Sequence, residues 1–224
     1  MDTLDLFSDP QTGDSSLREE VEEELTAAEV LAKLEEAWSN EKQSPELLTP
    51  QMEVVECMQE QVRTMEGNLS RLGKTDLRVS VHRLELARIK FLISSYLRLR
   101  LEKLQTHVWH YSCGEPGQGE GRLTAEEAVL AGQLREGLTQ HFSSLCLQHL
   151  PGAWDPKTAA PGVGKPSQHA AVFTRAVREV GGLEVGDPAL MGREASLDME
   201  EGSQAIISYS CVRDRLGEGD LRLI

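Results

Sequence analysis

The chain has 224 residues, a net charge of −14 and a hydrophobic fraction of 39%, with few aromatic residues. This size suits one sizeable domain, or one domain with a small satellite, and the low aromatic content favours a helical scaffold filled with Leu, Val and Ala. The acidic balance argues against autonomous, tight DNA binding, which depends on cations that neutralise phosphates. No run approaches the ~20 apolar residues of a membrane helix, so we expect no membrane association.

Residues 1–24 are predicted to form an acidic, disordered tail. Residues 1–50 hold 14 acidic and 3 basic residues, and the tail is rich in turn formers and poor in apolar residues. Its exceptions are Leu4, Leu6 and Phe7, which stand among aspartates. These three residues form a candidate docking peptide that folds on a partner, with a solubilising tail as the alternative.

Residues 25–150 are predicted to form an α-helical domain, so that the protein is mainly α with a four-to-five-helix, bundle-like domain. A capping box at residues 26–29 opens the first helix, and Ser44-Pro45 has the residue order of a helix restart. Apolar residues then recur every three or four positions over residues 52–72. The last helix opens with another capping box and is expected to span residues 124–150.

The longest predicted helix, over residues 77–108, carries apolar residues on more than one side around residues 89–93. A helix with this pattern usually needs neighbours beyond those that its own small domain supplies. The pattern therefore favours a subunit of an assembly over an enzyme. The helix's basic residues are spread over several faces, so we expect them to meet acidic neighbours in a complex rather than nucleic acid.

After residue 150 the character of the sequence changes. Residues 151–168 are rich in Pro, Gly and Ala and are predicted to be a flexible linker. Residues 169–224 are predicted to form a small β-rich domain. Its strand signals include the alternating residues Ala205, Ile207, Tyr209 and Cys211. The apolar end of the chain, residues 221–224, is expected to pair as a last strand.

The four cysteines lie far apart and form no Cys-x-x-Cys pair: Cys57, Cys113, Cys146 and Cys211. No apolar signal segment stands at the N-terminus. We therefore expect a reducing, intracellular compartment rather than a disulfide framework.

The sequence offers no complete catalytic, cofactor or metal motif. The glycines of residues 117–121 follow a predicted helix rather than the strand that a dinucleotide site requires. Residues 162–167 resemble a nucleotide loop, but a proline stands where Ser or Thr should reach magnesium. His107, His110 and Cys113 are spaced three apart, yet a structural zinc site needs a fourth ligand and none lies nearby. We expect no catalytic, cofactor-binding or metal-binding residue.

Three blocks of the sequence together resemble the Sld-five family of the eukaryotic GINS complex. The blocks are residues 37–42 with 44–48, residues 76–82 with 94–98, and, more loosely, Gly202-Ser203-Gln204, Tyr209 and the terminal Leu221-Arg222-Leu223-Ile224. The resemblance runs in order from about residue 26 to the C-terminus. It departs from the family in the first 24 residues, in the loop 112–121 and in the linker 151–168.

The resemblance implies a non-catalytic, nuclear scaffold subunit. GINS is a four-subunit, pseudo-twofold assembly whose subunits each combine a helical domain with a small β-rich one. The implied partners are the three other GINS subunits, the Cdc-forty-five protein and the hexameric MCM ring, which together form the replicative helicase for initiation and elongation. In that assembly the MCM ring hydrolyses ATP. The family also implies that an N-terminal tail can tether a replisome hub protein.

The candidate subunit interface combines residues of the first helix, the long helix and the C-terminal domain. It consists of Trp38, Glu85, Arg88, Ile89, Leu92, Tyr96, Leu97, Arg98, Tyr209, Leu223 and Ile224. Two alternatives remain open at this stage. One is an unrelated helical adaptor, and the other is a metal-dependent enzyme with its site near His107.

Overall fold

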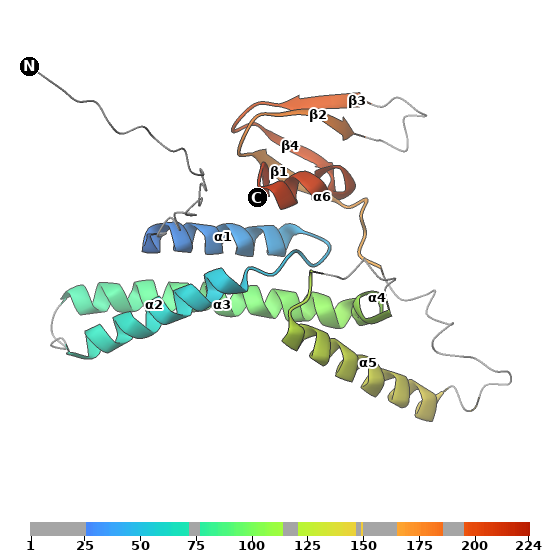
Figure 1. Cartoon of the computed structure of the whole chain (residues 1–224), viewed down its shortest axis with the longest axis horizontal. Helices are drawn as coiled ribbons and strands as arrows, with labels where there is room; N and C mark the ends of the chain where they lie inside the picture. Colours follow the sequence, from blue (N-terminus) through green and yellow to red (C-terminus); the bar gives the residue numbers. More distant parts are fainter. Residues whose placement is uncertain (1–25, 72–76, 114–120, 147–148, 150–164, 186–194) are drawn as a thin grey trace, which may run out of the picture.

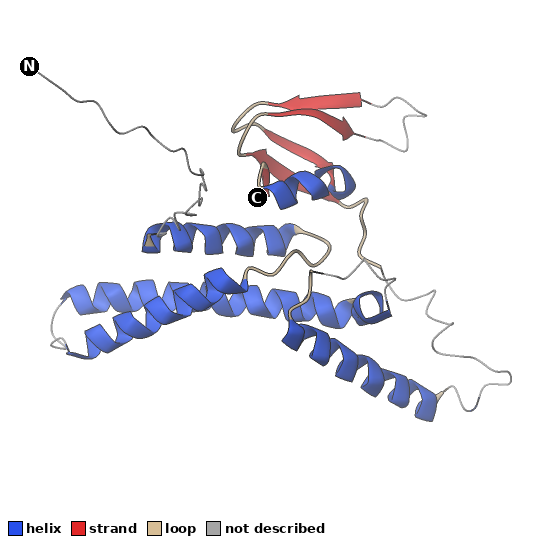
Figure 2. Cartoon of the chain, viewed as in Figure 1, coloured by secondary structure: helices blue, strands red, loops and turns tan. Residues whose placement is uncertain are grey.

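The computed structural model describes residues 26–71, 77–113, 121–146, 149, 165–185 and 195–224 (Figure 1). The predicted docking peptide with Leu4, Leu6 and Phe7 and most of the predicted linker lie outside the described residues. Helices come first in the chain, and a region of strands with one helix among them follows (Figure 2). The predicted class, mainly α with a small β-rich C-terminal part, is confirmed.

The helical region contains five helices within the described ranges. They are α1 (Ala27–Gln43), α2 (Met52–Arg71), α3 (Leu77–Thr106), α4 (Val108–Cys113) and α5 (Ala125–Leu145). Both predicted capping boxes are present, with Thr26 and Thr124 each accepting a hydrogen bond from the backbone of the glutamate three residues on. None of these helices is long and apolar enough to cross a membrane.

Two helix ends differ from the prediction. The long helix stops at Thr106 instead of residue 108, and a short helix continues after His107. After this break, Val108 and Tyr111 are buried in a small core with Leu47. The last helix ends at Leu145 rather than at residue 150.

Helix α1 lies alongside α2 and α3, which run side by side (Figure 1). Their shared core is formed by the buried residues Val30, Leu34, Val55, Met58, Leu92, Ile93 and Tyr96. Helix α5 leaves this bundle and packs through its first part against α4 and the end of α3. Only Ala131 of α5 is fully buried, so most of this helix is uncovered.

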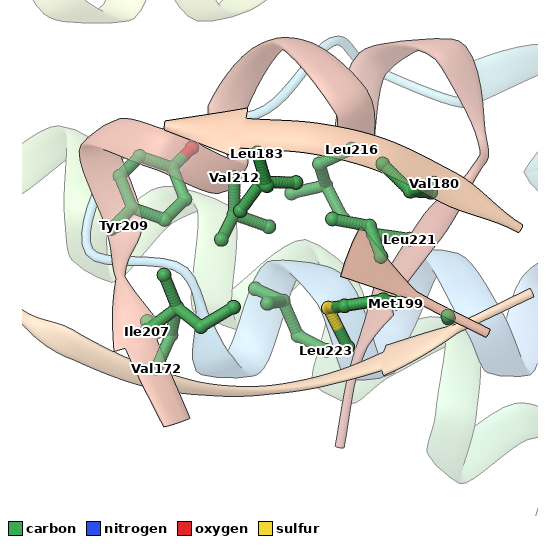
Figure 3. Close-up of a cluster of buried hydrophobic side chains, with 11 residues drawn as sticks. Val172, Val180, Leu183, Met199, Ile207, Tyr209, Val212, Leu216, Leu221 and Leu223 are labelled. Atoms are coloured by element: carbon green, nitrogen blue, oxygen red, sulfur yellow. The ribbon is translucent and has the colours of Figure 1, made fainter. Parts of the chain in front are cut away.

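The C-terminal region holds β1 (Ala171–Ala176), β2 (Val180–Val185), β3 (Ala195–Met199), β4 (Gln204–Ser208), α6 (Tyr209–Glu218) and β5 (Leu221–Leu223). Strands β4, β1 and β5 form an antiparallel sheet in that order, and β2 pairs with β3. Figure 3 shows the apolar core between these strands and α6. The expected terminal strand is confirmed, because β5 pairs antiparallel with β1.

The strand predicted through Tyr209 and Cys211 is wrong beyond Ser208. The chain there turns into α6, whose buried residues Tyr209, Val212 and Leu216 recur at helical spacing. Gly219 ends the helix with a φ of 79°, a left-handed conformation that favours glycine. The alternating pattern therefore ended at the last residue of β4, and the helical spacing after it was missed.

Candidate functional site

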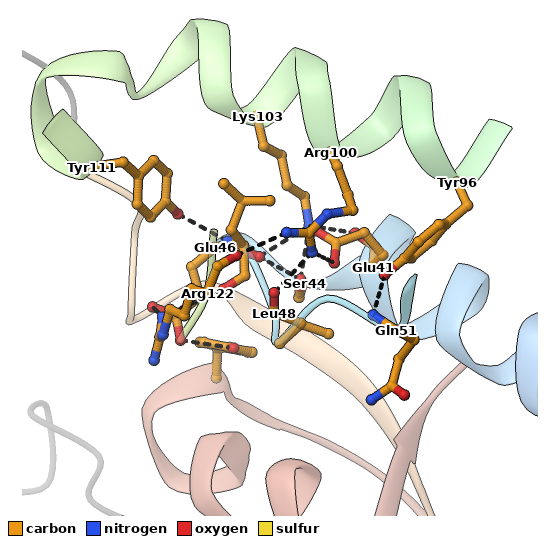
Figure 4. A network of polar contacts seen from close by, with 12 residues as sticks. Glu41, Ser44, Glu46, Leu48, Gln51, Tyr96, Arg100, Lys103, Tyr111 and Arg122 are labelled. Carbon is orange, nitrogen blue, oxygen red and sulfur yellow. Dashed lines mark hydrogen bonds and ion pairs between the residues drawn. The ribbon is translucent and has the colours of Figure 1, made fainter. Parts of the chain in front are cut away.

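A buried polar cluster joins α1, α3 and α5 to the loop that follows α1 (Figure 4). At its centre Arg100 is fully buried. Its guanidinium donates two 2.8 Å hydrogen bonds to the Glu127 carboxylate and one of 3.3 Å to Glu41. Two further bonds of 2.8 Å reach the carbonyl oxygens of Leu48 and Arg122. All five guanidinium N–H donors therefore have acceptors, which is what a buried arginine requires.

The cluster keeps Arg100 charged. Burial alone would lower the pKa of Arg100, but the hydrogen bond with Glu127 and the charge of Glu41 raise that pKa above its ordinary value. Burial likewise raises the pKa of Glu127, and the hydrogen bonds from Arg100 and Thr124 outweigh it, so the pKa of Glu127 lies below its ordinary value. Both groups are therefore ionised at neutral pH.

Lys103 ties the loop after α1 to the same cluster. Its ammonium donates to a Glu41 carboxylate oxygen at 2.8 Å, to the Ser44 hydroxyl at 2.8 Å and to the Glu46 carbonyl oxygen at 3.0 Å. It also donates to the carbonyl oxygen of Glu41. Burial lowers the pKa of Lys103, and the charge of Glu41 opposes this shift. The lysine thus fixes the loop where Ser44 and Pro45 interrupt the helices.

Glu46 connects the helical region to the C-terminal region. Its carboxylate is 3% exposed and lies 2.6 Å from the Arg122 guanidinium and 3.0 Å from that of Arg213 on α6. The Tyr209 hydroxyl donates to it at 2.9 Å. Burial, followed by the neighbouring charge of Glu46, raises the pKa of Tyr209. One buried carboxylate therefore accepts from both regions of the chain.

A second polar contact holds β5 against α1. The backbone N–H of Leu223 donates to the Asn40 side chain at 2.8 Å, and the Ser39 hydroxyl donates to the Leu223 carbonyl oxygen at 3.1 Å. Leu223 itself is buried. Together with Glu46, this contact fixes the C-terminal region on the helical region at two separate points.

The chemistry of the cluster is structural. Each charged group already has a partner in the chain. The hydroxyls of Tyr111 and Tyr96 accept from the backbone N–H groups of Leu47 and Gln51, and the Tyr209 hydroxyl donates to Glu46. Among the described residues, no three His, Cys, Asp or Glu side chains are grouped to hold a metal. His110 lies edge-on to Tyr111 at a centroid distance of 5.0 Å, and the Cys113 side chain falls outside the description.

Two helix faces expose large apolar side chains. On α3, Leu77, Val81, Leu84 and Phe91 are 77%, 47%, 73% and 63% exposed, and we call them the α3 stripe. Their spacing of four, three and seven residues places them on one side of the helix. On α5 the exposed apolar residues are Val129, Leu130, Phe142 and Leu145.

The predicted interface residues fall into three groups. Leu92, Tyr96, Tyr209 and Leu223 are buried in the chain's own cores, and Trp38, Ile89 and Leu97 pack against them. Glu85 and Arg88 are exposed and make ion pairs within the chain, with His82 at 2.9 Å and Glu35 at 3.0 Å. Arg98 and Ile224 remain exposed. Contacts of these residues with another subunit stay a prediction.

Sequence reasoning missed the polar cluster. Glu41 and Glu46 stand in the blocks that resemble the family but were given no role, and Arg122 lies in no motif. Arg100 and Lys103 were expected to meet acids of other subunits, whereas they meet acids of this chain. One signal could have revealed Arg100. Arg100 lies four residues after Tyr96 and four residues before Leu104, and this helical spacing places it on the buried face of α3.

Comparison with known proteins identifies the family of this chain. Residues 40–145 match the model of the GINS complex protein helical bundle domain, and residues 166–224 match that of the DNA replication complex GINS protein SLD5 C-terminus. The second match covers the C-terminal region that Glu46 joins to the helices. The two matches follow the order of the helical and C-terminal regions in this chain.

Individual relatives agree with the family models. The chain is 37% identical to the DNA replication complex GINS protein SLD5 of Mus musculus, over 100% of this chain and 99% of the mouse protein. It is 38% identical to that of Xenopus laevis, over 92% of this chain and 95% of the frog protein. The Arabidopsis thaliana protein of that name is 28% identical, over 85% and 89% of the two chains. The chain therefore belongs to the SLD5 family of DNA replication complex GINS proteins.

Proposed function

We propose that this chain is a non-catalytic, structural subunit of the GINS complex, assembled with three other subunits. Its family membership supports the complex. The observation that carries a scaffold role is the α3 stripe, because four large apolar side chains on one exposed helix face mark a protein contact surface. The polar cluster supports the same role, since its groups hold the chain's own two regions together.

The α3 stripe and the predicted interface residues have different roles in this proposal. The stripe contacts a neighbouring subunit directly. The half-buried Trp38 and the buried Tyr96 act indirectly, because Trp38 donates to Ser95 at 2.9 Å and the Tyr96 hydroxyl accepts from the Gln51 backbone at 3.1 Å. They fix α1 and α2 on α3 and thereby keep the stripe uncovered.

We further propose that the assembled complex joins the Cdc-forty-five protein and the MCM ring in the nucleus, as part of the replicative helicase. The resemblance of residues 37–42, 44–48, 76–82 and 94–98 to the Sld-five family supports this step. The docking peptide, Leu4, Leu6 and Phe7, is proposed to tether a replisome hub protein. Deleting residues 2–12 should abolish hub binding in a pull-down, and unchanged binding would eliminate the docking role.

Co-expression with the three other GINS subunits tests the scaffold proposal. The wild-type chain should copurify with them in equal amounts, and the double variant Leu84→Ser, Phe91→Ser should lose at least one. Met65→Ser is the matched control, because Met65 is an exposed apolar residue outside the stripe, on α2. Equal recovery of all three forms would refute a role of the stripe.

The same purification separates the remaining alternatives. An unrelated helical adaptor would not copurify stoichiometrically with the three subunits. A metal-dependent enzyme would retain metal near His107 on elemental analysis of the purified protein. The chain made alone should associate through its apolar faces, so a monodisperse monomer at micromolar concentration would count against the proposal.

A further inference from the structure

A cavity of about 420 Å³ opens where the helical and C-terminal regions meet. We call it the junction cavity. Its charged and titratable lining residues are Glu46, His110, Arg122, Lys165, His169 and Arg213. Three permanent cations thus surround one carboxylate, in a chain whose net charge is −14. The lining of the cavity is therefore positive although the chain as a whole is negative, and this local difference in charge calls for a physical explanation.

Glu46 cannot account for this excess of positive charge. Its carboxylate is already engaged by Arg122, Arg213 and the Tyr209 hydroxyl. Lys165 has no carboxylate of its own among the residues that line the cavity. With the histidines neutral, the lining keeps two positive charges in excess.

His110 responds to the same field. Burial lowers the pKa of His110; His107, Lys165 and Arg122 lower it further, and the Glu46 carboxylate partly opposes them. A group at the edge of this cavity is therefore surrounded mainly by positive charge. A bound anion would reverse that field.

The cavity walls are fixed before any ligand arrives. The carbonyl oxygen of Arg122 accepts from Arg100, which holds that side of the cavity on α3. The segment with Lys165 is held to α6, because the Ser210 backbone N–H donates to the Gln168 carbonyl oxygen at 2.9 Å. Pro166 is buried and restricts the backbone beside Lys165. A site held in this way binds with little loss of conformational freedom.

We propose that the junction cavity binds a phosphate group on a phosphorylated serine or threonine side chain of a partner protein. Such a group carries a charge of about −1.5 to −2 and three acceptor oxygens, which match two excess cations and several N–H donors. Arginines and lysines that converge on one point are typical of phosphate recognition.

A nucleic-acid ligand fits the cavity less well. Single-stranded nucleic acid is held by a cationic groove that follows many phosphates and by aromatic side chains on which bases stack. The junction cavity is a local pocket, and no Phe, Tyr or Trp is among its lining residues. The acidic charge of the whole chain opposes a polyanion but affects a single phosphate side chain less.

Binding would also tie the two regions of the chain together. His110 and Arg122 belong to the helical region, whereas Arg213 and residues 165–169 belong to the C-terminal region. A ligand that bridges both stabilises their docked arrangement by mass action. A phosphorylated partner would then bind preferentially to the subunit whose two regions are docked. This preference does not depend on how the subunit assembles with others.

Calorimetric titration of the full chain, purified with any subunits that copurify, tests this proposal. The probes are N-acetyl-phosphoserine amide, its unphosphorylated counterpart, inorganic phosphate and a short oligothymidylate, at one ionic strength. Wild type should bind the phosphoserine probe saturably and the unphosphorylated probe not at all. Lys165→Ala should weaken binding about tenfold, the loss expected for one charge-assisted contact.

Lys33→Ala is the matched control, because Lys33 is an exposed lysine that lines a different cavity. It removes the same charge from the chain and should leave phosphoserine binding unchanged. Lys165 is exposed, so its replacement should leave the unfolding temperature unchanged. The proposal is overturned if wild type does not bind the phosphoserine probe, or if both lysine variants bind it equally well. Tighter binding of oligothymidylate than of phosphoserine would also overturn it, in favour of nucleic acid.

Discussion

Replacing Arg100 by methionine should destabilise the fold strongly. The variant keeps an apolar stem in place of the arginine's aliphatic part but removes the cation that Glu127 and Glu41 face. Removing one partner of a buried ion pair leaves an uncompensated charge and costs about 3–5 kcal/mol. Glu41 retains Lys103 at 2.8 Å, and Glu127 keeps 12% side-chain exposure. We therefore expect a loss of about 3 kcal/mol, near the lower end.

Two further variants separate charge from packing. Adding Glu127→Gln to Arg100→Met removes the stranded carboxylate charge, so about half of the lost stability should return. Arg98→Met is the control. Arg98 lies on the same helix but is exposed, and such surface changes stay within about 0.5 kcal/mol.

The effect of Arg100→Met should also depend on pH. The pKa of Glu127 lies below its ordinary value in the folded chain, despite the opposing effect of burial. A carboxylate of this kind contributes stability above its unfolded pKa and loses it as the pH falls through the folded pKa. The stability difference between wild type and Arg100→Met should therefore be full at neutral pH and narrow below pH ~4.5, the unperturbed value for glutamate.

Urea unfolding followed by circular dichroism measures these differences, at protein concentrations where the midpoint no longer depends on concentration. The free energy of unfolding should fall in the order wild type, double variant, Arg100→Met. The reasoning would be refuted if Arg100→Met and Arg98→Met lost equal stability. It would also be refuted if Glu127→Gln lowered the stability of Arg100→Met further.

Three smaller changes complete the test of the fold. Tyr209→Phe removes the hydrogen bond to Glu46 and should lower the unfolding free energy in urea by about 1–2 kcal/mol, with faster proteolytic cleavage between the two regions. Gly219→Ala places a side chain at a φ of 79° and should cost about 1 kcal/mol, seen as a lower melting temperature. Thr124→Ala removes the cap of α5 and should cost about 1 kcal/mol in the same urea assay, with some loss of helical signal.

The helices could be predicted from the sequence because their signals are local. Thr124 and Glu127 form their capping box within four residues, and the apolar residues of α2 repeat within one turn. The terminal strand was also predictable, since an apolar chain end needs cover. The helix break at His107 was not, because no local signal marks it and the core that Val108 and Tyr111 form includes Leu47, some sixty residues earlier in the chain.

The polar cluster could not be predicted because its partners are distant in the sequence. Arg100 bonds to residues 52 and 59 positions before it and to others 22 and 27 positions after it. In the sequence, Arg100 is one of many basic residues on a long helix. Only the packing of α1 and α5 against α3 decides that this arginine, and not Arg98, is buried among acids.

Polar contacts join the two regions of the chain to each other, whereas the α3 stripe is an exposed apolar surface. The junction between its regions rests on Glu46 and on the pair formed by Asn40 and Leu223, whose hydrogen bonds are directional and fix one orientation. Buried ion pairs add little net stability, because desolvation offsets their attraction. The apolar α3 stripe carries no such directional constraint, and the area it can bury is available to a partner. Changes at Glu46 should therefore alter how the two regions are oriented, whereas changes in the stripe should alter what the chain binds.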